Sequence, residues 1–169
     1  MKKIINFIIF QLIWFACIYG AATNHECLAI VLGLSGVAIN VYQGKELRRD
    51  LDLLVKGTLL GIFIDTLLIQ LNLISFTTNY WKAISPVWIW VVWAGFLSTV
   101  NYSLSWLKGR LVLAAIFGSV MGPLSYWAGV SMGAGHFDHP NKSLLAISII
   151  WLFATPILMR VSQRKFHPI

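Results

Sequence analysis

The chain has 169 residues, of which 58% are hydrophobic and only 11% are charged, and its net charge is +7. A soluble domain carries roughly 25% charged residues, so this chain cannot cover itself with a polar surface. The lysines and arginines lie in short clusters between apolar segments instead of on one solvated face. This pattern argues against a nucleic-acid-binding protein and is typical of a membrane protein.

Six apolar segments follow one another, and each approaches the roughly 20 residues that a transmembrane helix needs. The segments are continuously apolar instead of alternating, which favours helices over the strands of a barrel. The sequence therefore predicts one all-α domain over residues 1–169, a bundle of six transmembrane helices: Ile4–Ala22, Cys27–Gln43, Leu53–Ile74, Pro86–Trp106, Leu111–Met132 and Ser143–Met159.

The first segment resembles a secretory signal, because two lysines precede it and Gly20-Ala21-Ala22 ends it. Its apolar run is longer than the usual ~7–15 residues of a signal peptide, and Trp14 suits a retained helix better. We therefore expect an uncleaved first helix.

The distribution of cations predicts the orientation. Ten cations lie on one side of the predicted bundle: Lys2, Lys3, Lys45, Arg48, Arg49, Lys108, Arg110, Arg160, Arg164 and Lys165. The loops of the other side hold only Lys82 and Lys142, and Lys56 begins the third segment. Because cytoplasmic loops are enriched in Lys and Arg, we expect a multi-pass protein of the bacterial inner membrane with both termini in the cytoplasm.

Asp65 is the first candidate for a functional residue. It lies about twelve residues into the third segment, hence ~18 Å along a helix and near the membrane midplane. A charge at this depth is expensive unless it is paired, protonated or hydrated, so Asp65 should face the bundle interior. It is either a functional carboxylate or a protonated strut between helices. Tyr126 of the fifth segment lies at a similar height and is the candidate partner, with Thr66 and Ser125 as neighbours.

A second polar layer lies nearer the cytoplasm and consists of Gln11, Asn40, Asn101 and Ser105. Side-chain amides that bridge transmembrane helices contribute roughly 0.6–2 kcal/mol each, and this structural role is favoured. A pocket for a lipid headgroup is the alternative, because three cations lie close to this face: Arg48, Arg49 and Arg110. The candidate substrate-binding residues are thus Asp65, Tyr126, Ser125, Asn101, Asn40 and Gln11.

The fifth segment contains small residues spaced by four, three and four: Gly118, Gly122, Ser125 and Gly129. This spacing places them along one side of a helix and predicts close packing against a neighbour. Pro123 removes a backbone hydrogen bond and should disturb the helix beside Ser125 and Tyr126, where a cavity could form.

The loops at the extracytoplasmic side contain residues of types that bind metals: His25, His136, Asp138 and His139. Their spacing fits no established motif, so a metal site is a weak alternative to ordinary loop residues.

Cys17 and Cys27 lie near the same membrane face, where two packed thiols are favoured over a disulfide. The chain has no Cys-x-x-Cys pair, so a thiol–disulfide or zinc-ribbon role has no support, and we predict no cofactor.

Residues 122–129, Gly-Pro-Leu-Ser-Tyr-Trp-Ala-Gly, form the most specific motif of the chain. Together with residues 101–107 and the opening Asn6, Gln11 and Trp14-Phe15, it resembles an uncharacterised bacterial family, domain of unknown function 2878. The resemblance covers nearly the whole chain and implies a small bacterial inner-membrane protein. It brings no established activity, cofactor or catalytic residue, and it slightly favours a role connected with lipids.

Three functions are open at this point. The favoured one is a protein that binds or modifies a lipid or another amphiphile in a polar cavity near Asp65. The alternatives are a small proton-coupled transporter with Asp65 as the carrier, and a non-catalytic scaffold or subunit. The expected partners are membrane lipids, a second copy of the chain or another membrane protein, and the sequence does not decide whether the protein is an enzyme.

Overall fold

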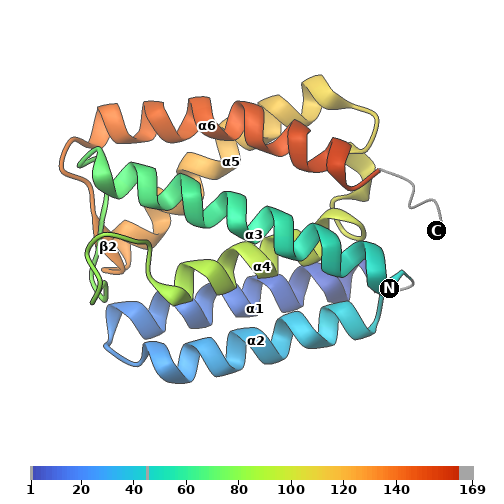
Figure 1. Ribbon diagram of the computed structural model, residues 1–169, viewed down its shortest axis with the longest axis horizontal. Coiled ribbons are helices and arrows are strands. Elements are labelled where there is room, and N and C mark those ends of the chain that lie inside the picture. Colours follow the sequence, from blue (N-terminus) through green and yellow to red (C-terminus); the bar gives the residue numbers. More distant parts are fainter. Residues whose placement is uncertain (1, 45, 164–169) are drawn as a thin grey trace.

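The computed structural model describes residues 2–44 and 46–163 (Figure 1). Within these residues the chain forms six α-helices: α1 Lys2–Ala22, α2 Glu26–Tyr42, α3 Leu47–Gln70, α4 Val87–Val100, α5 Leu111–Ser131 and α6 Pro140–Val161. The three shorter elements are the strands β1 Ser75–Phe76 and β2 Gly135–His136 and the 3₁₀ turn η1 Ser105–Leu107. The prediction of an all-helical chain with six helices is confirmed.

Three helices of the described part, α1, α5 and α6, are long and apolar enough to cross a membrane. α2 and α4 are also apolar but shorter, with 17 and 14 residues, and α3 has 24 residues of which six are charged. Large apolar side chains such as Leu12, Phe63 and Phe153 are exposed on the outside of the bundle. The length and composition of α1, α5 and α6 indicate a membrane protein.

The third predicted segment, Leu53–Ile74, is shifted in the structure. α3 begins six residues earlier, at Leu47, because a charged stretch can continue a helix as well as an apolar one can. It ends at Gln70 because Asn72 adopts a left-handed conformation (φ 52°) and the Leu73 N–H donates to the Leu68 carbonyl over 3.0 Å. This is the closure that commonly ends a helix.

The fourth predicted segment, Pro86–Trp106, was too long. α4 ends at Val100, and the Thr99 carbonyl accepts hydrogen bonds from the backbone of both Tyr102 and Leu104 at 3.0 Å. Residues 101–104 therefore form turns that lead into η1. The other four segments agree with the helices to within three residues at each end.

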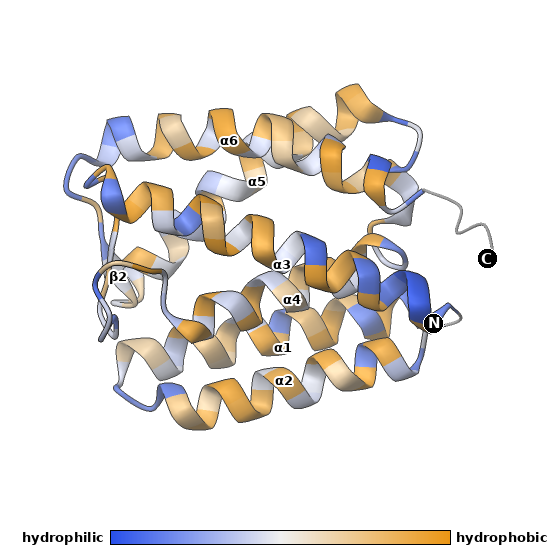
Figure 2. Ribbon diagram, in the orientation of Figure 1, coloured by the Kyte–Doolittle hydropathy of each residue, from blue (hydrophilic) through white to orange (hydrophobic). Residues whose placement is uncertain are grey.

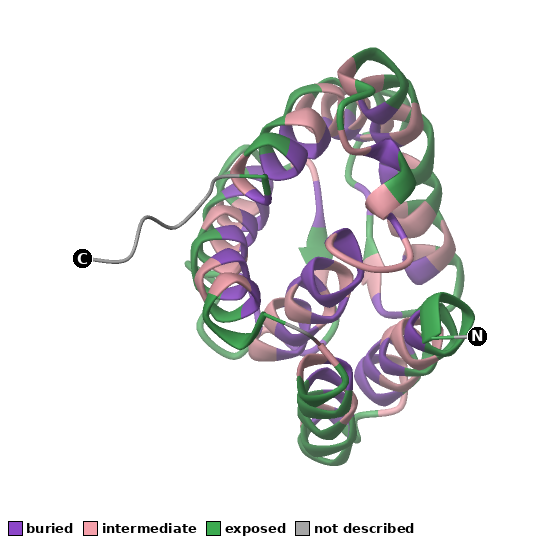
Figure 3. Ribbon diagram, turned by 90° about the vertical axis from the view of Figure 1, so that its right-hand side faces the viewer, coloured by how far each residue is buried: buried purple, intermediate pink, exposed green. Residues whose placement is uncertain are grey.

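α4 is the centre of the bundle, and nine of its fourteen residues are buried. It packs against α1, α2 and α3, whereas α5 packs chiefly on α6, and α6 also contacts α3. In the hydropathy view the helices are mostly apolar along their length, and the hydrophilic residues gather toward the ends (Figure 2). The view along the bundle shows buried residues on the inner faces and exposed ones outside (Figure 3).

The connections between helices lie alternately at the two ends of the bundle (Figure 1). We call the end with β1 and β2 the strand end, and the end with the start of α1 and the end of α6 the opposite end. At the strand end β1 pairs antiparallel with β2, with Ser75 opposite His136, which the sequence did not predict. Tyr80, in the connection between α3 and α4 that also contains β1, donates to Glu26 at the start of α2 over 2.6 Å. The α3–α4 connection is therefore joined both to the α1–α2 hairpin and to the α5–α6 connection.

Both cysteines are free thiols, so no disulfide joins α1 and α2. Cys17 is buried and its sulfur lies 4.0 Å from the Ala29 carbonyl, as a packed thiol should. Cys27 is exposed, so the expectation of a second packed thiol was wrong.

Candidate functional site

The carboxylate of Asp65 joins three helices. Asp65 lies on α3 and is fully buried; its Oδ2 accepts a hydrogen bond from Trp93 Nε1 of α4 at 2.6 Å. Its Oδ1 accepts from the Tyr126 hydroxyl of α5, also at 2.6 Å. The Trp93 ring fits against α3 because Gly61 has no side chain: a Cβ at this position would lie 2.2 Å from the ring. Both carboxylate oxygens are therefore held by donors in an otherwise apolar interior.

A fourth helix completes this group. The indole of Trp151 on α6 stacks on that of Trp93, with ring centroids 4.9 Å apart and an interplanar angle of 10°. We call Asp65, Trp93, Tyr126 and Trp151 the Asp65 cluster. It connects α3, α4, α5 and α6 through two hydrogen bonds and one ring stack.

The predicted pairing of Asp65 with Tyr126 is confirmed. The two neighbours proposed to join them have other partners. The Thr66 hydroxyl accepts from the Ser85 N–H at 3.2 Å, and Ser125 Oγ accepts from Trp14 Nε1 at 2.9 Å. The Asp65 cluster thus gains its other members, the two tryptophans, from α4 and α6.

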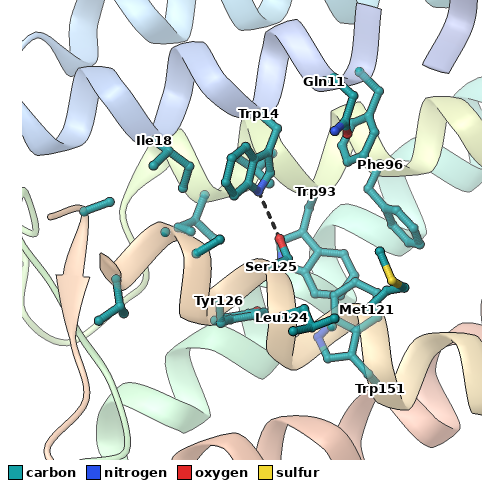
Figure 4. A pocket seen from close by; sticks show the side chains of 18 of the residues that line it. Gln11, Trp14, Ile18, Trp93, Phe96, Met121, Leu124, Ser125, Tyr126 and Trp151 are labelled. Carbon is teal, nitrogen blue, oxygen red and sulfur yellow. Dashed lines mark hydrogen bonds between the residues drawn. The ribbon is translucent and has the colours of Figure 1, made fainter. Parts of the chain in front are cut away.

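A cavity of about 330 Å³ lies between α1, α4 and α5, with α6 contributing to its wall (Figure 4). We call it the α1–α5 cavity. Along α1 it extends from Phe7 to Ile18, which is about 16 Å of helix, so it is elongated parallel to the bundle. Its wall is rich in aromatic rings, among them Phe10, Trp14, Trp88, Phe96, Phe117 and Trp151.

The polar candidates divide between the cavity and its surroundings. Gln11, Ser125 and Tyr126 line the cavity, and the hydrogen bond from Trp14 to Ser125 crosses from α1 to α5 (Figure 4). Asp65 does not line it but lies behind the wall that Trp93 and Tyr126 form. The cavity borders the residues after Pro123, where the sequence predicted one, although α5 remains helical throughout.

Asn40 belongs to a separate network of α1, α2 and α4. Its Nδ2 donates to Ser98 Oγ at 3.0 Å and to the Asn6 carbonyl at 3.3 Å. The Asn6 amide in turn donates to the Ser98 carbonyl at 3.1 Å and accepts from the Ser103 hydroxyl at 2.8 Å. These bonds bridge helices, which agrees with the structural role favoured for Asn40.

Asn101 lies in a polar group at the opposite end. Its Nδ2 donates to Asp50 Oδ1 at 2.6 Å, its Oδ1 accepts from Lys108 Nζ at 2.6 Å, and the Tyr102 hydroxyl donates to the other Asp50 oxygen. Burial, followed by the charge of Arg49, lowers the pKa of the Lys108 ammonium. Asn101 does not line the α1–α5 cavity described above, although it was among the candidate substrate-binding residues, and it lies apart from Asp65, as its place in the second predicted polar layer implies.

The three arginines proposed to bind a headgroup lie at this same end. Arg49 forms an ion pair with Glu46 at 2.7 Å, and Arg48 and Arg110 are exposed. Lys45, Arg164 and Lys165, which contributed to the predicted orientation, lie outside the described residues. Binding of a headgroup by these arginines stays a prediction.

The glycines of α5 contact two different helices. A Cβ at Gly118 would lie 2.1 Å from Thr155 Oγ1, and one at Gly122 would lie 2.4 Å from the Trp151 ring, so both face α6. Gly129 faces Ile18 of α1 instead, at 3.1 Å. The predicted close packing along this side of α5 is confirmed, but the side contacts α6 at Gly118 and Gly122 and α1 at Gly129 instead of a single neighbour. Gly118 and Gly122 pack within the chain and are not available to a second copy.

The residues considered for a metal site do not gather. His25 Nδ1 lies 3.2 Å from the Thr23 hydroxyl, and His136 is part of β2. Among residues 2–44 and 46–163, no group of three or more histidine, cysteine or acidic side chains could hold a metal ion. The loop with Asp138 and His139 therefore forms no such cluster with His25.

A family model described as "Protein of unknown function (DUF2878)" matches residues 3–157. The chain belongs to this family. The match includes all of α2 to α5 and every member of the Asp65 cluster. No curated protein and no solved structure matches the chain. The family description gives no activity, so the geometry of the chain is the basis for its function.

Asp50 was not among the residues singled out from the sequence, yet it is only 5% exposed and organises the opposite end of this DUF2878 chain. Asp50 was overlooked because the third segment was expected to begin at Leu53, so Asp50 was expected to lie in an exposed loop. Trp93 was overlooked for another reason: the sequence of an apolar helix does not show which acceptor a tryptophan N–H will bind.

Replacing Asp50 with alanine should lower the free energy of unfolding by about 1–2 kcal/mol, because the Asn101 amide loses its buried acceptor. Unfolding can be followed by circular dichroism during titration of mixed micelles with sodium dodecyl sulfate. The matched control is Asp52→Ala on the same helix, where the carboxylate pairs with an exposed Lys56 at 2.6 Å and should change stability by less than about 0.5 kcal/mol. Equal losses in both variants would contradict the assignment.

Proposed function

We propose that this protein binds a lipid or another long-chain amphiphile in the α1–α5 cavity. The observation that carries the proposal is the cavity itself: about 330 Å³, elongated, apolar and lined by aromatic rings. This volume lies at the lower end of the roughly 300–1,000 Å³ typical of ligand pockets. An elongated apolar space suits a hydrocarbon chain better than a compact polar metabolite.

The cavity is also open toward the apolar outside of the bundle. Three of its lining residues are about half exposed: Phe7 at 46%, Met121 at 47% and Leu124 at 49%. They lie on α1 and α5, two of the helices that are long and apolar enough to span a membrane. A chain entering between these helices would come directly from the bilayer without passing through water.

We propose that all six helices span the bacterial inner membrane, with both termini in the cytoplasm. At the opposite end lie seven described cations: Lys2, Lys3, Arg48, Arg49, Lys108, Arg110 and Arg160. The strand end holds Lys82, in the connection between α3 and α4, and Lys142, in the first turn of α6. This asymmetry supports a cytoplasmic opposite end, where exposed arginines would also favour anionic lipids.

Asp65 takes a positioning role in this proposal. Its two oxygens hold Trp93 and Tyr126, which form part of the cavity wall, and the carboxylate itself does not reach the cavity. The ligand would contact Tyr126, Ser125 and Gln11 among the polar side chains. A carrier role for Asp65 in proton-coupled transport finds no comparable support, because the carboxylate does not line the cavity and both of its oxygens accept hydrogen bonds within the bundle.

The proposal is tested by filling the cavity. Ala128 lines it on α5, so Ala128→Phe should reduce binding of a pyrene-labelled fatty acid about tenfold or more, an effect of about 1.4 kcal/mol. Binding is measured in lipid nanodiscs by energy transfer from the tryptophans of the wall to pyrene.

Val120→Phe is the matched control. It adds the same ring to the same helix, but Val120 is 51% exposed and is not part of the cavity wall. Wild-type protein that does not transfer energy to the probe would refute the proposal, and so would equal binding by the wild type and Ala128→Phe.

A further inference from the structure

The wall of the α1–α5 cavity carries no charge: none of its lining residues, all of them within the described part of the chain, is acidic or basic. The nearest cation before Gln11 on α1 is Lys3, eight residues earlier and thus ~12 Å along the helix. A carboxylate or a phosphate held at Gln11 would lie among apolar groups without a counter-charge, which is strongly unfavourable. We therefore expect the part of a ligand that enters the cavity to be uncharged.

Three of the polar side chains in this wall already have hydrogen-bond partners. Thr99 donates to a carbonyl of its own helix. Ser125 accepts from Trp14, and Tyr126 donates to the Asp65 carboxylate behind the wall. These bonds hold the wall together, so a ligand would have to compete with them.

Gln11 differs from these residues because its amide is accessible and has no partner. The side chain lines the cavity and is partly exposed, and it makes no hydrogen bond with the described residues (Figure 4). Other unpartnered polar atoms of the wall are enclosed by protein: those of Trp88, Trp151 and Thr155. The Gln11 amide is not among the enclosed groups, so a ligand can reach both its donor and its acceptor.

Gln11 lies at the open side of the cavity. It is nine residues from Lys2 at the start of α1, hence ~14 Å from the opposite end. Met121 is ten residues from the start of α5 at the same end, hence at ~15 Å, and it is about half exposed. A chain that enters from the bilayer beside Met121 would thus meet the Gln11 amide at the entrance. Toward the strand end the wall is apolar and includes Ile18, Ile74, Phe76, Val130 and Ala134.

The chemistry of the amide selects its partner. A glutamine side chain presents two N–H donors and one carbonyl acceptor. A hydroxyl group can accept from an N–H and donate to the carbonyl while it remains uncharged, whereas an ester or ether oxygen can only accept. The hydrocarbon of a membrane offers neither a donor nor an acceptor. A lipid hydroxyl therefore satisfies the Gln11 amide more completely than an ester, an ether or a bare hydrocarbon chain does.

We propose that Gln11 binds the hydroxyl group of an uncharged lipid, such as a long-chain alcohol or a diacylglycerol. The hydroxyl group lies at Gln11, and the apolar chain extends from there through the cavity toward the strand end. This inference rests on the proposed amphiphile-binding function and names the ligand class and its orientation in the same cavity.

The test is competition against the pyrene-labelled fatty acid in nanodiscs, with competitors compared by their mole fraction in the lipid. They are heptadecane, 1-hexadecanol, dioleoylglycerol and hexadecyl phosphate. At least one of the two hydroxyl-bearing competitors should displace the fatty acid at about tenfold lower mole fraction than heptadecane does, as two added hydrogen bonds imply. The better of the two identifies the source of the hydroxyl group. Hexadecyl phosphate, which is charged, should be no better than heptadecane.

Gln11→Met keeps the length and the helix propensity of the side chain while removing its donors and its acceptor. It should remove the advantage of the hydroxyl-bearing competitors over heptadecane. The fatty acid enters by its apolar pyrene end, so its own binding should be unchanged. Gln70→Met is the matched control and should keep the advantage, because Gln70 is exposed on α3, donates to the Ala83 carbonyl and does not line the cavity.

The outcomes separate the two proposals. The hydroxyl site is refuted, while amphiphile binding stands, if the fatty acid binds but the hydroxyl-bearing competitors are no better than heptadecane. The same conclusion follows if hexadecyl phosphate is as effective as they are, or if Gln11→Met keeps their advantage. If the fatty acid does not bind to the wild-type protein, both proposals are refuted.

Discussion

Replacing Asp65 with alanine should lower the free energy of unfolding by about 2–5 kcal/mol. The substitution removes the acceptor of both the Trp93 indole and the Tyr126 hydroxyl inside a fully buried site. Each buried donor that loses its partner costs about 1–3 kcal/mol. Asp65→Asn keeps one acceptor oxygen and should lose about half as much. The measurement is reversible unfolding by sodium dodecyl sulfate in mixed micelles, followed by circular dichroism.

The sign of the effect should change when the donors are removed first. In a Trp93→Phe, Tyr126→Phe background the carboxyl group has no donor, so Asp65→Leu should be neutral or stabilising. Phenylalanine at position 93 retains an aromatic ring against Trp151 and Gly61, which makes this background a fair reference. A loss above about 2 kcal/mol for Asp65→Leu in that background would mean that Asp65 stabilises the fold through other contacts.

The heights of residues along the helix axes could be predicted from the sequence. A helix rises by a fixed 1.5 Å per residue, so counting from the loops placed Asp65 and Tyr126 at the same height, and they are hydrogen-bonded. The same counting separated Asn101 from Asp65, and Asn101 lies with Asp50 at the opposite end. It did not show where α4 ends, because the apolar run continues past Val100. Hydropathy gives the extent of an apolar segment and not the turn that ends the helix inside it.

The lateral arrangement could not be predicted. Helices that are apolar on all sides have no periodic polar face, so their sequence does not identify their neighbours. The hydrogen bond from Trp14 to Ser125, which are 111 positions apart, could therefore not be predicted. For the same reason the sequence predicted a cavity beside Tyr126 but only one of the α1 residues that line it, Gln11. The small residues of α5 were recognised, but their division between α6 and α1 depends on where these two helices lie.

Replacing Gly118 with alanine should lower the free energy of unfolding by about 2–3 kcal/mol. The added Cβ would lie 2.1 Å from Thr155 Oγ1 and 2.5 Å from the Trp151 carbonyl oxygen. Because the carbonyl belongs to the backbone of α6, the whole helix must move away, and overpacking of this kind costs about 1–3 kcal/mol. The measurement is the same detergent unfolding, and the movement should also reduce binding in the cavity that Thr155 and Trp151 line.

The control for this prediction is Gly129→Ala on the same helix. Its Cβ would meet only the end of the Ile18 side chain, at 3.1 Å, and that methyl group can shift. Alanine is favoured over glycine within a helix by up to about 1 kcal/mol, so Gly129→Ala should be neutral or stabilising while Gly118→Ala destabilises. Two substitutions with the same chemistry and the same helix propensity would then differ in sign. Since the only difference is the neighbour that each glycine faces, stabilisation by both would show that α6 does not pack on Gly118.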